Sequence, residues 1–158
     1  MTSLELFSAL QANPISNFIG HQNHLFGAVA QLFHITGLIL VLTSVLVVSL
    51  RLLGLGLVRQ TVPQLVQATS RFVWVGIALL TVSGLVIFLP AAAHYDPNPI
   101  FWLKFELLAL ALVLHVTLYR KVTQSEEAPR PIVAKGTAFL ALSLWFGIAF
   151  AGRFIGFY

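Results

Sequence analysis

The chain has 158 residues, of which 58% are hydrophobic and only 9% are charged. Its mean hydropathy is +0.92. A water-soluble domain of this size could not bury so much apolar surface, so we expect an integral membrane protein. The absence of cysteine excludes disulfides and thiolate metal sites, and a single methionine argues against a thioether copper site. The net charge of +4 comes from short basic segments between apolar runs, so nucleic acid is not an expected partner.

The first residues predict a short amphipathic helix on the outer surface of the membrane. Thr2 and Glu5 have the spacing of a capping box, and Leu4, Phe7 and Leu10 recur at helical intervals. An Asn-Pro pair follows, which is typical of the start of a second helix. The segment lacks the basic start and the small-residue cleavage site of a signal peptide, so we expect it to remain in the mature protein.

Four apolar stretches are long enough to cross a bilayer, which takes about 20 helical residues. They run approximately over residues 25–50, 72–91, 100–119 and 137–157. Lipid offers no partners to backbone groups, so each stretch should be helical. The short connections predict an all-α fold: an integral membrane, up-down antiparallel four-helix bundle that forms a single transmembrane domain over residues 1–158.

The orientation follows from the basic residues, which are concentrated on the cytoplasmic side of bacterial membrane proteins. They flank the first and third connections: Arg51, Arg59, Arg71, Arg120, Lys121, Arg130 and Lys135. We therefore expect a multi-pass protein of the bacterial inner membrane with both termini in the periplasm.

Ionisable residues inside a membrane are costly and are candidates for function. Five of them fall within the predicted spans: His34, Lys104, Glu106, His115 and Arg153. With a rise of about 1.5 Å per residue from the cytoplasmic basic residues, all but His115 reach the outer leaflet. His115 lies near the cytoplasmic face, so it cannot share one iron with His34.

His34 lies on a helix face of small residues that includes Gly37, with Gln31 one turn earlier. An axial imidazole with slim neighbours suits a haem b, and Lys104 and Arg153 could bind the propionates. A second axial ligand could come from His24, His94 or His21, or be absent. The alternative interpretation is that His34 only forms a hydrogen bond between helices.

The outer histidines form a separate pattern that could bind copper or zinc. His21 and His24 are three residues apart, and His94 lies in the outer loop. Imidazole ligands suit both Cu(II) and Zn(II). A metal site made of His21, His24 and His94, with or without His34, is therefore the second hypothesis.

Three segments carry a resemblance to known families: "HITGLILVLTSVLVVSLRLLGLGL", "NPIFWLKFELLALALVLHVTLYRKV" and "LALSLWFGIAFAGRFIGFY". Together they resemble an uncharacterised family of bacterial four-helix membrane proteins, over nearly the whole chain. More distantly, the span-one histidine and the "W-x-K" that opens span three are similar to HemJ-type protoporphyrinogen oxidases and to the membrane domain of CopD-type copper proteins. The HemJ resemblance implies a porphyrin site at His34, Trp102, Lys104 and His115.

We therefore expect a membrane haem b protein, similar to a cytochrome b, that acts in electron transfer or in porphyrin redox chemistry. This hypothesis leaves open whether the chain is an enzyme or an electron carrier. A quinone, a redox partner subunit or a second copy of the chain are its possible partners within the lipid bilayer. The alternatives are a metal-handling or transport protein that faces the periplasm and binds copper, and a cofactor-free structural subunit of a membrane complex.

Overall fold

The computed structural model describes residues 2–57, 59–124 and 130–157, and these are almost entirely helical. Four long helices form the bundle: α3 (His24–Leu53), α4 (Val62–Phe88), α6 (Pro99–Leu114) and α8 (Pro131–Phe154). Shorter elements join or cap them: α1 (Ser3–Gln11), α2 (Pro14–Gly20), α5 (Ala92–Tyr95), α7 (Arg120–Gln124), 3-10 turns at Leu89–Ala91 and Ile155–Phe157, and a π-helical turn at His115–Tyr119. The predicted all-α bundle is confirmed.

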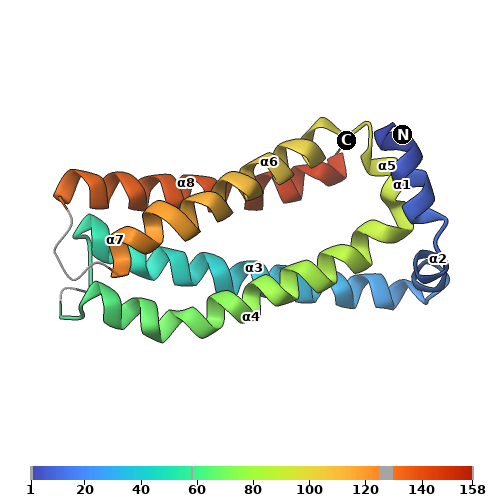
Figure 1. Cartoon of the computed structure of the whole chain (residues 1–158). Coiled ribbons are helices and arrows are strands. Elements are labelled where there is room, and N and C mark those ends of the chain that lie inside the picture. Colours follow the sequence, from blue (N-terminus) through green and yellow to red (C-terminus); the bar gives the residue numbers. More distant parts are fainter. Residues whose placement is uncertain (1, 58, 125–129, 158) are drawn as a thin grey trace.

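The long helices run antiparallel, and both chain termini lie at the same end, which we call the terminal end (Figure 1). The opposite end, with the α3–α4 and α7–α8 connections, is the loop end. Four segments are long and apolar enough to cross a membrane: His24–Leu53, Val62–Tyr95, Pro99–Thr123 and Pro131–Phe157. Large apolar side chains such as Leu32, Ile39 and Phe139 are exposed along them, as expected of side chains that face lipid.

Two of the helices begin earlier than the apolar stretches predicted. Helix α4 begins at Val62, where Thr61 and Gln64 form a capping box, and α8 begins with Pro131 in its first turn. Prolines and caps of this kind are tolerated at helix starts because the first backbone N–H groups have no partner within the helix. The extra turns continue the helices beyond the predicted stretches.

Helix α3 lies between α4 and α8, and α8 packs along α6. The buried core is concentrated toward the loop end, where α3 contributes Val41, Val45 and Val48 and α8 contributes Ala138 and Trp145. Toward the terminal end, the α3–α4 pair diverges from the α6–α8 pair (Figure 1). Before residue 41, only Ala30 and Gly37 of α3 are buried. The interior is therefore packed more loosely at the terminal end.

Helices α3 and α4 approach each other most closely at two glycines. A Cβ atom added to Gly76 would lie 2.8 Å from the carbonyl oxygen of Gly37, and one added to Gly37 would lie 2.8 Å from the carbonyl oxygen of Gly76. Only glycine fits such a contact, which is common where membrane helices cross. This contact lies about one helical turn from His34.

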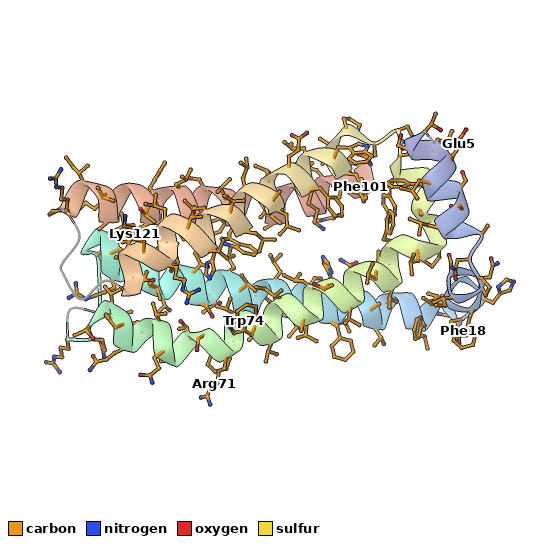
Figure 2. The ribbon with its side chains drawn as sticks, viewed as in Figure 1. Glu5, Phe18, Arg71, Trp74, Phe101 and Lys121 are labelled. Atoms are coloured by element: carbon orange, nitrogen blue, oxygen red, sulfur yellow. The ribbon has the colours of Figure 1, made fainter. Side chains whose placement is uncertain are left out.

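The terminal end is closed by α1 and an aromatic cluster. The predicted capping box is present, since the Glu5 carboxylate accepts a hydrogen bond from the Thr2 N–H and the Thr2 hydroxyl accepts one from the Glu5 N–H. Phe7 is buried against Phe88, Phe101 and Trp102, so the apolar side of α1 covers the bundle end. Phe101 lies at this end in Figure 2, whereas Lys121 lies at the opposite end.

Candidate functional site

His34 is held against α4 by a hydrogen bond inside the bundle. Its Nδ1 atom lies 3.0 Å from the hydroxyl oxygen of Ser83. The hydroxyl of Ser83 donates in turn to the backbone carbonyl of Leu79, and Ser83 is buried. The imidazole covers Gly84, because a Cβ atom there would lie 3.3 Å from Cε1 of His34. A Cβ atom at position 84 would therefore require the ring to shift by a few tenths of an ångström.

These contacts assign the tautomer of the neutral imidazole. The hydroxyl of Ser83 has one hydrogen, which it gives to the carbonyl of Leu79. Toward His34 it can only accept, so Nδ1 of His34 carries the proton. A hydrogen bond with the backbone of Leu80 also holds the ring. In a neutral ring protonated at Nδ1, Nε2 keeps its lone pair, which is the arrangement in which a histidine binds a metal while a second residue orients it.

Lys104 reaches the same interior region from α6. Its side chain passes Gly152 of α8, where an added Cβ atom would lie 3.5 Å from the Lys104 Nζ atom. The ammonium group is close enough to His34 to interact with it electrostatically. In the part of the chain that the structure describes, no side chain forms an ion pair with it. A partly buried cation without a counterion, within a membrane span, favours an anionic ligand.

All four long helices therefore contribute to one site, which we call the His34 site. It consists of His34 from α3, Ser83 and Gly84 from α4, Lys104 from α6 and Gly152 from α8. The imidazole packs over Gly84, and the lysine chain packs over Gly152. The site combines one potential metal ligand with one cation in an apolar bundle.

Arg153 does not join this site, contrary to the expectation that it would lie beside His34 and Lys104. It is exposed, and its guanidinium group lies over the ring of Phe157, 5.0 Å from the ring centroid. Arg153 is near the end of α8, one residue after Gly152, and successive residues of a helix point in directions about 100° apart. Counting residues predicted the depth of Arg153 in the membrane, but the direction of its side chain depends on the rotation of α8 about its axis.

Trp102 belongs to the terminal end and not to the His34 site. Its indole N–H donates to the backbone carbonyl of Asp96, 2.9 Å away, and its ring stacks on Phe7. Phe101 beside it is buried and stacks on Phe88 and Tyr95. Trp102 therefore holds α1 and the α5–α6 connection together at the end of the bundle.

The predicted neighbours of His34 on α3 have separate roles. Gly37 is buried in the close contact with α4. Gln31 and His24 are exposed on the same face of the helix, one turn and three turns before His34. Because α3 is continuous from His24, the two histidines are separated by about 15 Å along the helix, too far to bind one iron.

His115 lies in the half of the bundle near the loop end, as its depth predicted. It begins the π-helical turn, and its ring stacks on that of Tyr119 with 5.1 Å between centroids. Tyr119 is buried, and its hydroxyl faces the buried Ser49 of α3. His115 is therefore separate from His34, and the structure does not bring it to the predicted porphyrin site.

The outer histidines are not brought together. The Nδ1 atom of His21 lies 2.6 Å from the carbonyl oxygen of Asn17, and His94 is exposed in α5 next to Tyr95. Among the residues with described positions, no group of three or more His, Cys, Asp or Glu side chains could hold a metal ion. The predicted set of His21, His24 and His94 does not form a metal site in this structure.

Ser83, Gly84 and Gly152 were not among the site residues predicted from the sequence. The available signal was the adjacent Ser-Gly pair in the second half of span two, opposite the depth of His34. Which face of α4 meets α3 depends on the Gly37–Gly76 contact, and sequence spacing alone did not identify that pair.

A family model matches residues 12–158, which include the four long helices and every residue of the His34 site. The chain belongs to DUF6644, a family of unknown function. The predicted resemblance to an uncharacterised family is therefore confirmed. Neither the curated proteins nor the solved structures contain a match to this DUF6644 chain, so they give no support to a similarity with HemJ-type or CopD-type proteins.

Proposed function

We propose that this chain is a membrane protein that binds haem b through His34 and takes part in electron transfer within the bilayer. The observation that carries the proposal is the hydrogen bond from Nδ1 of His34 to Ser83, which leaves Nε2 available as a ligand. Metal-bound histidines nearly always donate their other N–H group in this way.

The donor set of the His34 site suits a haem. One neutral imidazole would supply a ligand to the iron, and Gly84 lets the ring pack directly against α4. The Lys104 ammonium supplies a charge-assisted hydrogen bond for a propionate carboxylate. The described histidines other than His34 lie elsewhere, so His34 would be the single protein ligand to the iron.

The chain contributes binding, orientation and exclusion of water. His34 binds the iron, Ser83 fixes the ring, and Lys104 neutralises a carboxylate that would otherwise be costly inside the membrane. The aromatic cluster around Phe101 closes the terminal end above the site. The haem supplies a one-electron redox couple, whose potential the axial ligand and the surrounding polarity set.

The placement of charges supports an orientation. Basic residues lie near the loop end, including Arg51, Arg59 and Lys121, and Arg71 points away from the bundle in Figure 2. By the positive-inside rule, the loop end faces the cytoplasm, and both termini face the periplasm of the bacterial inner membrane. The His34 site then lies in the periplasmic half of the bilayer.

The test is an absorption spectrum of the purified protein after expression with added haem. We expect a Soret band in the oxidised protein and a sharp alpha band after reduction with dithionite. His34→Ala should lose both bands, whereas His115→Ala, which changes a histidine outside the site, should keep them. Absence of both bands from the unmodified protein would overturn the proposal. Full haem content in a folded His34→Ala variant would overturn the assignment of the ligand.

A further inference from the structure

A groove lies beside the His34 site, between the α2–α3 junction and the end of α4. We call it the α2–α4 groove; its volume is about 280 Å³, near the lower end for small-molecule sites. Polar residues of the α3 start and apolar residues of α4 line it. The members used below are His24, Gly27, Gln31, Val86, Ile87 and Pro90.

The groove leads along α3 toward His34. His24, Gly27, Gln31 and His34 are spaced by three and four residues, so they share one face of the helix. On α4, Val86 and Ile87 follow Ser83 by the same spacings. The inner end of the groove is therefore one helical turn from the hydrogen bond between His34 and Ser83.

The lining indicates the chemistry of a ligand. None of the residues that line the groove is an aspartate, glutamate, lysine or arginine, so it offers no counterion to a phosphate. The side chains of His24 and Gln31 form no hydrogen bond with any described residue, although Gln31 lies within a membrane span. An unpaired amide at that depth favours a ligand with an uncharged hydrogen-bonding oxygen.

The two polar side chains lie along the length of the groove. Seven residues separate them, which is about 10.5 Å along the helix, so they can contact polar atoms at two different points of one ligand. The apolar side chains of Val86 and Ile87 would face the ligand.

We infer that the α2–α4 groove binds the head group of an isoprenoid quinone. A quinone is uncharged, carries two opposed oxygens, and reaches the groove from the lipid. Its position next to a redox cofactor rests on the proposed function of the His34 site, whereas its binding depends only on the groove. The inferred contacts are hydrogen bonds to His24 and Gln31 and apolar packing on α4.

The test uses the full chain in nanodiscs of zwitterionic phospholipid. A short-chain benzoquinone analogue is titrated by calorimetry, and a photoreactive quinone locates the site by mass spectrometry. The unmodified protein should bind the analogue saturably and be labelled within residues 19–31 or 86–90. Gly27→Leu should abolish binding, because a side chain at this position meets no protein atom within 4 Å of its Cβ and would enter the groove. Gln31→Leu should weaken binding roughly five- to tenfold, as expected for a lost hydrogen bond.

The matched controls are Gly136→Leu and Gln67→Leu. Gly136 also has open space around an added Cβ, and it lies in α8 away from the groove. Gln67 is an exposed glutamine toward the loop end of α4. Both controls should bind the analogue as the unmodified protein does.

Three outcomes would overturn the inference: no saturable binding, unchanged binding by Gly27→Leu, or photolabelling that phospholipid displaces and quinone does not. The last outcome would identify the groove as a lipid site. Haem spectra and quinone titrations of two variants distinguish failure of the proposed haem site from failure of the quinone inference. His34→Ala should lose the haem bands and keep quinone binding, whereas Gly27→Leu should keep the haem bands.

Discussion

Removal of the Ser83 hydroxyl tests the geometry of the proposed haem site. In Ser83→Ala, Nδ1 of His34 loses the hydroxyl oxygen of Ser83, and only the hydrogen bond with the backbone of Leu80 remains to hold the imidazole. Loss of such an outer partner typically weakens metal binding 10- to 100-fold. This corresponds to about 1.4–2.8 kcal/mol of binding free energy. We expect the dissociation constant for haem to rise by that factor while the helices remain intact.

Ser44→Ala is the matched control for this change. Ser44 is buried to the same degree as Ser83, at 4% exposure, and its hydroxyl also donates to the carbonyl four residues earlier, that of Leu40. It has no hydrogen bond to a histidine. Both variants therefore lose the same kind of bond within a helix, and only Ser83→Ala loses the partner of His34.

The assay is a titration of apoprotein in detergent with haem, followed by the Soret absorbance. Equal affinity of Ser83→Ala and the unmodified protein would refute the view that Ser83 holds the ligand tautomer. An equal loss in Ser44→Ala would show that the effect comes from helix packing and not from His34.

Three further predictions concern the cation, the helix contact and the orientation. Lys104→Met should weaken haem binding by about 1.5–3 kcal/mol, the range for a hydrogen bond to a charged group. The same variant should bind the haem dimethyl ester, which has no carboxylate, as well as the unmodified protein does. An equal loss of affinity for the ester would contradict the ion pair. Gly76→Ala should lower the free energy of unfolding by about 1–3 kcal/mol, measured in a mild denaturing detergent, because its Cβ atom would lie 2.8 Å from a carbonyl oxygen of α3. An unchanged free energy of unfolding would contradict the close approach of the two helices. The chain has no cysteine, so a single introduced cysteine is the only thiol that a reagent can label. In spheroplasts, a membrane-impermeant thiol reagent should label Ser3→Cys and not Gln60→Cys. The reverse labelling pattern would contradict the proposed orientation.

Much of the fold could be predicted because the membrane restricts the choices. A span of about 20 apolar residues has to be helical in lipid, which gave all four long helices. The start of α4 at Val62 was missed because the prediction followed hydropathy, whereas the helix continues beyond the apolar stretch. The capping pattern of Thr61 and Gln64 was the local signal for this start.

The candidate site was predicted only in part. The depth of a residue in the membrane can be counted along its helix, but the rotation of the helix about its axis, which sets the direction of the side chain, cannot. Lys104 lies within electrostatic range of His34, and the two residues were predicted at equal depth. Arg153 has a similar depth but points away toward Phe157. The partner of His34 depends on which face of α4 it meets, and the contact between Gly37 and Gly76 sets that face.

The bond between Nε2 of His34 and a haem iron is tested most directly by resonance Raman spectroscopy of the reduced, haem-loaded protein. We predict an iron–histidine stretching band that disappears in His34→Gly and returns when imidazole is added to that variant. A band that persists in His34→Gly without imidazole would contradict ligation by His34.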